Sequence, residues 1–339
     1  MPRRLTLAIG ASCLLAALLA IVVPGLTRGT HSPGASHGPL GAAGAESSSH
    51  GGSHGAAWSG DAVPVQPALF HAGSCVRLAP TRGDRHETVF LDAGHGGVDP
   101  GATGEDEAGR AVHEADLTLR VELRSAALLR SAGFTVVLSR TTGSLVGRLG
   151  AQDFSGGLLS AQGVHDDVAA RDECADLAHA AVLVGIYFDA GGSPQNAGCL
   201  TSYDQARPFW EASLRLAELV QGDVISAINS RGWGVPDYGV TPDVGLGGPA
   251  LDAAAADYGH LLLLGPAEPG WFPTPSEMPG ALIEPLFVTD PFEASIAASA
   301  AGQQAIAGGI ALAVEQYFAP GAPRLATRAR LGGRSGRGR

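Results

Sequence analysis

Apolar runs of strand length alternate with stretches of helical period along the middle of the chain. This pattern predicts strands at residues 88–91, 135–139, 182–187, 261–264 and 281–284. It predicts helices at residues 115–131, 166–179, 209–230 and 291–318. Strands that are apolar throughout and alternate with helices are typical of an α/β fold. We therefore expect a mostly parallel twisted sheet flanked by helices on both faces.

The order of these elements also predicts where a site would form. Binding sites of mostly parallel sheets lie at the carboxyl ends of the strands. Three of the expected strands run directly into polar segments, at residues 92–97, 187–190 and 284–287. We expect the side chains of these segments to meet at one edge of the sheet.

The two ends of the chain differ from its middle. Residues 5–23 contain no charge and follow Arg3 and Arg4, which is typical of an export signal. A cleaved signal peptide and an uncleaved membrane anchor, within residues 1–27, both remain open, and either places the rest of the chain outside the cytoplasmic membrane. We expect a flexible linker at 28–65, a single catalytic domain at 66–320 with its core at 87–318, and a disordered tail at 321–339.

Charge is unevenly distributed over the 339 residues. All 22 basic residues are arginine, and between residues 86 and 320 there are 30 acidic residues against 10 arginines. So acidic a core argues against nucleic acid as a partner, because phosphates require a basic face. Six arginines lie in the last sixteen residues, so this basic tail is a candidate tether to anionic wall polymers or lipid headgroups.

Cysteine use fits an exported protein. Cys13 lies inside the apolar segment, and Cys75, Cys174 and Cys199 lie beyond it. An oxidising compartment allows one disulfide among these three residues and leaves one thiol over. The sequence does not select the pair.

Candidate chemistry begins with His95, which stands in a glycine-rich segment directly after the first strand. Asp and Glu at residues 105–107 follow this segment, so it is a poor phosphate-binding loop. Glu114 opens the next helix, and Glu284 ends a buried strand. An imidazole and carboxylates at one sheet edge are groups that bind metal ions and transfer protons.

Five motifs resemble those of the zinc-dependent N-acetylmuramoyl-L-alanine amidases, which cleave the bond between N-acetylmuramic acid and L-alanine in peptidoglycan. They are DAGHGGVDPGATG at Asp92–Gly104, EADLTL at Glu114–Leu119, VVLSR ending at Arg140, the helix segment Arg171–Asp176, and the closing segment Pro279–Pro291. The resemblance covers roughly residues 87–318. It implies that His95 and Glu114 bind Zn²⁺, that Glu284 is the catalytic glutamate, and that peptidoglycan is the partner of a monomeric enzyme.

One position departs from the family pattern. Tyr187 stands where the family has its third zinc ligand, a histidine. A phenol of pKa about 10 must lose a proton to ligate, which costs on the order of 4 kcal/mol at pH 7. His260 and then His113 are the candidates to replace the missing ligand.

Three functions therefore remain open from the sequence. The first is a cell-wall amidase that tolerates Tyr187 and uses a zinc-activated water with Glu284 as general base. The second is a degenerate amidase that has lost zinc and binds peptidoglycan without cutting it. The third is a zinc exopeptidase on a similar sheet.

Overall fold

The structure of the protein, a computed structural model, describes residues 62–191, 197–244 and 258–320. The N-terminal apolar segment, almost all of the expected linker and the basic tail lie outside the described residues. Their assignment as signal or anchor, linker and tether stays a prediction. Among the described helices none is long and apolar enough by itself to cross a membrane, and one bent pair, Pro291–Ala298 with Ala300–Tyr317, passes on length and composition.

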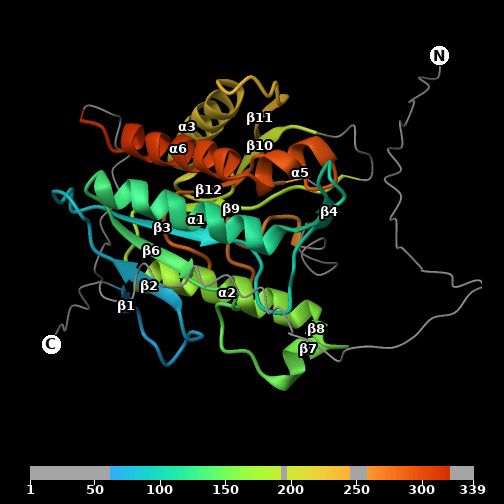
Figure 1. The fold of residues 1–339 in the computed structure, drawn as a ribbon. Helices are drawn as coiled ribbons and strands as arrows, with labels where there is room; N and C mark the ends of the chain where they lie inside the picture. The colour runs from blue at the N-terminus through green and yellow to red at the C-terminus, as the bar shows by residue number, and fades with distance from the viewer. Residues whose placement is uncertain (1–61, 192–196, 245–257, 321–339) are drawn as a thin grey trace, which may run out of the picture. The chain divides into compact units, whose positions relative to one another are not determined.

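One eight-stranded mixed sheet runs through the described residues (Figure 1). Its order is β1-β2-β6-β3-β9-β12-β10-β11, and the four central strands β6, β3, β9 and β12 are parallel. Its strands are β1 Ala62–Pro64, β2 Ser74–Leu78, β3 Thr88–Ala93, β6 Thr135–Arg140, β9 Val182–Ile186, β10 Cys199–Tyr203, β11 Asp237–Pro242 and β12 Gly280–Glu284. Two small hairpins lie outside it, β4 Thr103–Glu105 with β5 Ala111–His113 and β7 Phe154–Ser155 with β8 Leu158–Leu159. The α/β fold expected from the sequence is confirmed.

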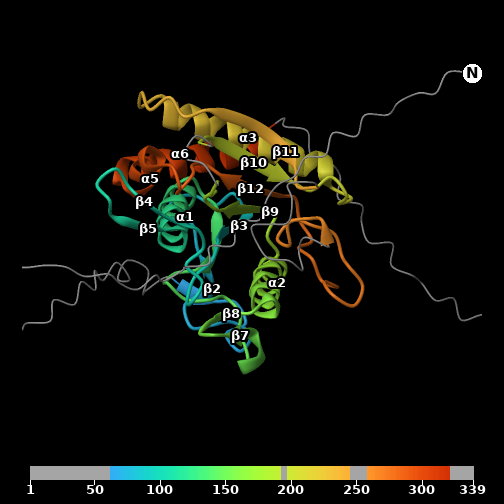
Figure 2. The same cartoon turned by 90° about the vertical axis from the view of Figure 1, so that its right-hand side faces the viewer.

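Helices cover both faces of this sheet, as Figure 2 shows. They are α1 Glu114–Ser131, α2 Ala161–Leu177, α3 Trp210–Asn229, α5 Pro291–Ala298 and α6 Ala300–Tyr317, with a short 3₁₀ helix at Ala151–Asp153. Alternate residues of a strand point to opposite faces. Val89 and Leu91 of β3 therefore pack in the core beneath α1, α3 and α6, whereas Phe90 packs in the core on the side of α2.

Two predicted elements differ in the structure. Residues 261–264 form turns rather than a strand. The run of four leucines is buried there because it covers the α2 face of the sheet. The helix expected over residues 291–318 is two helices bent by 78°, since Ser299 ends α5 and caps α6. Its hydroxyl oxygen accepts a hydrogen bond from the Gly302 N–H at 2.9 Å, which is a favourable helix start.

Four strands of the eight-stranded sheet, β1, β2, β10 and β11, were not predicted, and all of them lie toward its sides; the four short hairpin strands were not predicted either. β10, for example, reads Cys-Leu-Thr-Ser-Tyr and lacks a continuous apolar run. Its buried Thr201 is satisfied by a 2.8 Å hydrogen bond to the Gln221 side chain from α3. The hydrophobic pattern does not predict β10, because a hydrogen bond to a buried polar side chain takes the place of apolar packing at Thr201.

The structure selects the disulfide that the sequence left open. Cys75 of β2 is bonded to Cys174 of α2, and Cys199 is a buried free thiol. The bond joins segments that are 99 residues apart in the chain. The bond therefore fixes α2 to the side of the sheet formed by β2. Because it closes a long loop, it restricts the unfolded chain more than a disulfide that closes a short loop would.

Candidate functional site

The loop after β3 presents His95 at the carboxyl edge of the sheet. His95 has a backbone φ of +62°, which few residues other than glycine adopt without cost. Its Nδ1 lies 2.7 Å from Oδ2 of Asp99, and its Nε2 lies 3.1 Å from Oε2 of Glu114. Both ring nitrogens therefore face a carboxylate.

Glu114 is held in place by backbone donors from two other segments. It is the first residue of α1, and its side chain is 3% exposed. Its Oε2 accepts a hydrogen bond from the Ala102 N–H at 2.8 Å, and its Oε1 accepts one from the Phe188 N–H at 2.9 Å. A Cβ on Gly101 would lie 2.7 Å from Oε2 of Glu114, so glycine is required beside the pair.

The two carboxylates determine the charge of His95. Burial lowers the pKa of this imidazole, but Glu114 and Asp99 outweigh that effect and raise the pKa to about 10. His95 is therefore an imidazolium at neutral pH unless a bound cation replaces the proton on Nε2. The sequence motif named His95 and Glu114 but not Asp99, although Asp99 lies in the same glycine-rich segment.

Tyr187 turns away from this pair. Its hydroxyl donates a hydrogen bond to Oδ2 of Asp92 at 3.1 Å, below the loop, while its ring meets the edge of the His95 ring with centroids 5.5 Å apart. Gly94 allows this position, since a Cβ there would lie 2.4 Å from the tyrosine ring. Burial and the Asp92 charge raise the pKa of Tyr187 well above its usual range, so a phenolate is disfavoured.

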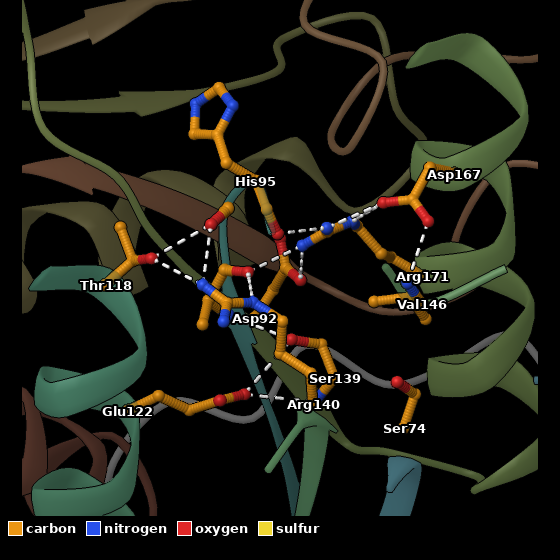
Figure 3. Close-up of polar contacts among 12 residues, drawn as sticks. Ser74, Asp92, His95, Thr118, Glu122, Ser139, Arg140, Val146, Asp167 and Arg171 are labelled. Atoms are coloured by element: carbon orange, nitrogen blue, oxygen red, sulfur yellow. Dashed lines mark hydrogen bonds and ion pairs between the residues drawn. The ribbon is translucent and has the colours of Figure 1, made fainter. Parts of the chain in front are cut away.

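Two buried arginines support the loop from beneath, and Figure 3 shows them on either side of Asp92. Arg171 of α2 forms ion pairs of 2.7 Å with Asp92 and Asp167. It also donates to the backbone oxygens of Ala93 and His95, at 2.7 and 2.8 Å. The backbone of His95 is thus fixed by an arginine that is only 1% exposed.

Arg140, at the end of β6, completes this support. Its guanidinium donates to the backbone oxygens of Ala93, Gly94 and Ala115, at 3.1, 3.0 and 2.6 Å. These oxygens belong to the loop that carries His95 and to the first turn of α1, which carries Glu114. Arg140 therefore fixes the relative position of the two segments.

Glu284 ends β12 at the same edge of the sheet. Burial raises the pKa of its carboxyl group well above the usual range, and the negative charges of Asp189 and Glu114 add to the effect, while His95 opposes it. β12 runs parallel to β9 with Ile283 opposite Ile186, and Phe188, two residues beyond Ile186, donates its N–H to Glu114, so Glu284 ends at the edge that carries Glu114. The structure therefore places Glu284 at the sheet edge that carries His95 and Glu114, and it places Asp189 at the same edge, opposite Phe287.

The two histidines considered as replacement ligands do not complete the pair. His113 is exposed on β5 and caps no backbone group of α1 with its side chain. His260 pairs instead with Asp204, which follows β10. Since β10 runs antiparallel to β12, with Leu200 opposite Glu284, the end of β10 lies at the edge away from Glu284.

A three-residue zinc site is therefore not formed by the predicted ligands. Two atoms bound to one tetrahedral zinc lie about 3.3 Å apart, so Nε2 of His95 and Oε2 of Glu114, at 3.1 Å, suit two positions. The Tyr187 hydroxyl, committed to Asp92, does not suit the third. Within the described ranges, the one group of three His, Cys, Asp or Glu ligand atoms within 4.8 Å of one another is Asp204, Asp243 and His260.

Comparison with known proteins adds a family to this geometry. A sequence model described as N-acetylmuramoyl-L-alanine amidase matches residues 89–316. No curated protein matches the chain.

Solved structures share the fold. The CwlD amidase from Clostridioides difficile, solved in complex with the GerS lipoprotein, is similar over 68% of this chain and 98% of that one, with 22% identity and a TM-score of 0.51. The amidase AmiC2 of Nostoc punctiforme is similar over 69% of this chain and 98% of that one, with 22% identity and a TM-score of 0.47. At this identity, the first likeness shows the arrangement of the sheet and helices.

Proposed function

The chain belongs to the N-acetylmuramoyl-L-alanine amidase family, and from this premise we propose that it hydrolyses the amide bond between N-acetylmuramic acid and L-alanine in peptidoglycan. The observation that carries the proposal is Glu284, whose carboxyl pKa is raised well above its usual range at the edge where His95 and Glu114 meet. Such a carboxyl group is suited to proton transfer.

Glu284 is the group that moves protons in the proposed reaction. Hydrolysis of an amide removes a proton from water and delivers one to the leaving amine. Glu284 accepts the first proton as carboxylate and returns it as carboxylic acid. The neighbouring charges of Asp189 and Glu114, which raise its pKa, favour the protonated form between the two steps.

His95 and Glu114 are the residues that would hold Zn²⁺. The metal, when bound, polarises the amide carbonyl and lowers the pKa of a bound water. His95 must give up the proton on Nε2 to ligate, and Asp99 then accepts the hydrogen bond from the Nδ1–H, which fixes the ring. Because Tyr187 does not supply a third ligand, no step of the reaction is assigned to the metal.

The proposed location follows from the substrate and from the sequence. Peptidoglycan lies outside the cytoplasmic membrane, and residues 5–23 are an uncharged segment preceded by Arg3 and Arg4. The proposed protein is exported and acts in the cell wall or on the outer face of the membrane. Attachment to the membrane through residues 5–23 is part of this proposal.

One observation favours a second function, binding to peptidoglycan without hydrolysis. The Tyr187 hydroxyl is hydrogen-bonded to Asp92, and both side chains are buried. The hydroxyl is thus occupied by a carboxylate of the chain itself and does not face the His95–Glu114 pair. In this second function, the sheet edge with His95 and Glu284 binds the junction between the muramoyl group and the peptide and does not cleave it.

The deciding experiment incubates the full chain with purified peptidoglycan and counts the L-alanine amino groups that appear. We expect the wild type to release them and Glu284→Gln to reduce the rate by at least about 100-fold, since general acid–base groups contribute on that scale. Glu268→Gln is the control, because Glu268 is an exposed carboxylate. Unchanged release by Glu284→Gln would refute the proposed role.

The second function gives a different result in the same assay. Wild-type protein would then sediment with peptidoglycan and release no amino groups. Tyr187→His, which restores an imidazole at the third position, would produce release in the presence of Zn²⁺. Release of free amino acids from short peptides, with none from peptidoglycan, would instead indicate an exopeptidase.

A further inference from the structure

A second polar cluster lies at the opposite edge of the sheet from His95. Asp204 follows β10 and Asp243 follows β11, two parallel strands that end at the same edge. The register of β10 on β12 pairs Leu200 with Glu284 and Ser202 with Leu282, so β10 ends beside the start of β12. Asp204 and Asp243 are thus separated from Glu284 by the length of a strand.

His260 joins the two aspartates in this cluster. Its Nδ1 lies 2.7 Å from Oδ2 of Asp204 and 3.6 Å from Oδ1 of Asp243. The side chains of Asp204 and Asp243 are 1% and 0% exposed, while that of His260 is 18% exposed. One histidine nitrogen and two carboxylate oxygens therefore converge at a buried point beside an imidazole that is partly exposed.

The converging atoms are the ones without hydrogen bonds. Oδ2 of Asp204, Oδ1 of Asp243 and Nδ1 of His260 are all buried and lack a hydrogen-bond partner. At 2.7 Å, Nδ1 and Oδ2 of Asp204 are close, but the ring N–H does not point along the line between them. Three such atoms around one point are stabilised by a shared proton or by a cation between them.

The other oxygen of each aspartate is bound to the backbone. Oδ1 of Asp204 accepts hydrogen bonds from the N–H groups of Ala206 and Arg207, at 2.6 and 3.0 Å. Oδ2 of Asp243 accepts one from the Leu261 N–H at 2.9 Å. Both carboxylates are therefore held in fixed orientations, each with one oxygen directed into the cluster.

The adjacent arginine does not fill this position. The Arg207 guanidinium gives its hydrogens to the backbone oxygens of Leu264, Gly265 and Ser276. Its charge reaches Asp204 at longer range. A cation between Asp204, Asp243 and His260 would therefore have to come from solution.

The donor set indicates which cation suits the cluster. Ca²⁺ and Mg²⁺ prefer oxygen ligands alone, whereas an imidazole with two carboxylates suits Zn²⁺ and related divalent transition metals. Three protein ligands leave a fourth position for water on the side of the exposed imidazole. Two carboxylates also match the charge of a divalent ion.

We propose that Asp204, Asp243 and His260 bind Zn²⁺ in a site distinct from the sheet edge with His95, Glu114 and Glu284, which we call the amidase edge. The ion ties the ends of β10 and β11 to the segment that begins at Tyr258 and covers the α2 face of the sheet. Bound zinc in this protein therefore does not by itself report on the site of His95 and Glu114. The proposal is independent of the hydrolytic function.

The test measures binding of Zn²⁺ alone to chelator-treated full chain, by calorimetry and by metal content after dialysis. We expect His260→Gln and Asp243→Asn each to weaken one site by at least about 100-fold, because each removes a ligand. His260→Cys retains a zinc ligand and should restore binding. The four histidines between residues 28 and 65 are the same in the wild type and in all variants, so zinc bound there contributes equally to each measurement and does not affect the difference.

A matched control is His165→Gln. His165 is a buried histidine whose Nδ1 lies 2.8 Å from an aspartate, Asp166, and whose ring packs on Trp271, but it faces no second carboxylate in an ion pair. Zinc binding should be unchanged in this variant. Circular dichroism checks that each variant is folded.

Two results would overturn the proposal. One is zinc binding that is equally strong in the wild type, His260→Gln and Asp243→Asn. The other is loss of all zinc in His95→Gln with none lost in folded His260→Gln. Loss of peptide release in Glu284→Gln bears on the amidase edge alone, so failure of the proposed function and failure of this site are separate outcomes.

Discussion

Each edge of the sheet carries a histidine beside two carboxylates, and the two arrangements differ in how the nitrogens are used. His95 directs Nδ1 to Asp99 and Nε2 to Glu114, at 2.7 and 3.1 Å. His260 directs Nδ1 alone toward both Asp204 and Asp243, at 2.7 and 3.6 Å. One N–H cannot serve two carboxylates. The first trio is therefore satisfied by a proton on each ring nitrogen, whereas the second is the place where we propose that a cation binds.

The surroundings extend this difference. Beneath His95, the buried Arg171 and Arg140 bind the backbone of the loop and of α1. Beside His260, Arg207 binds backbone oxygens of the covering segment instead. The amidase edge is thus pre-organised by fixed charges of the chain itself, and the opposite edge depends on what binds there.

The largest expected effect comes from removing a charge beneath the amidase edge. Arg171→Met leaves the buried carboxylates of Asp92 and Asp167 without their partner. Breaking a buried ion pair from one side costs about 3–5 kcal/mol of unfolding free energy. Chemical denaturation measures this loss.

Arg110→Met is the matched control. Arg110 pairs with Asp106 at the same spacing along the chain as Arg171 with Asp167, but its side chain is 77% exposed. An ion pair with a solvent-exposed arginine is weak, and the backbone N–H groups of Ala108 and Arg110 still donate to Asp106 in the variant, so its loss should be several-fold smaller. Equal losses in the two variants would contradict the distinction between a fully buried arginine and a solvent-exposed one.

The sequence predicted the amidase edge much better than the opposite one, for a physical reason. His95 follows β3 and Glu284 ends β12, and these strands are largely apolar because they lie at the centre of the sheet. Asp204 and Asp243 follow β10 and β11, whose polar residues hide the strand pattern. When the strands themselves are not predicted from the sequence pattern, the pattern cannot predict that the residues after them lie close together.

The orientation of Tyr187 was also beyond the sequence. The motif position predicts only that residue 187 reaches the sheet edge. Its hydroxyl turns to Asp92 because β3 and β9 are neighbours, with Asp92 opposite Gly185, and because Gly94 leaves space for the ring. Both conditions depend on contacts between segments that lie far apart in the chain.

A smaller effect concerns Glu122, a buried carboxyl group in the layer beneath the amidase edge (Figure 3). Burial raises the pKa of Glu122 to about 8, although Arg140 opposes the shift. Because the folded pKa exceeds the unfolded value, its contribution to stability is intact below about pH 4.5 and is lost as pH rises toward 8, by at most about 1.4 kcal/mol per pH unit.

Glu122→Gln should therefore flatten the fall in unfolding free energy between pH 5 and pH 8. The Ser139 N–H, which donates to Oε1 of Glu122 at 3.0 Å, can donate to the glutamine oxygen in the same way. Denaturant titrations at several pH values measure the slope. An identical slope in wild type and variant would show that Glu122 is already ionised in the folded protein.

The smallest expected effect compares two tyrosines, one at each edge. Tyr187→Phe removes the donor to Oδ2 of the fully buried Asp92 and should cost about 1–3 kcal/mol of unfolding free energy, because the carboxylate oxygen loses a partner. Tyr258→Phe removes a hydrogen bond to the backbone oxygen of Pro266 at a half-buried site, and should cost no more than about 1 kcal/mol. Thermal and chemical denaturation in chelator measure both. If Tyr258→Phe were the more costly change without metal, the edge with His260 would already be rigid in the absence of a cation, which contradicts the difference drawn between the two histidines.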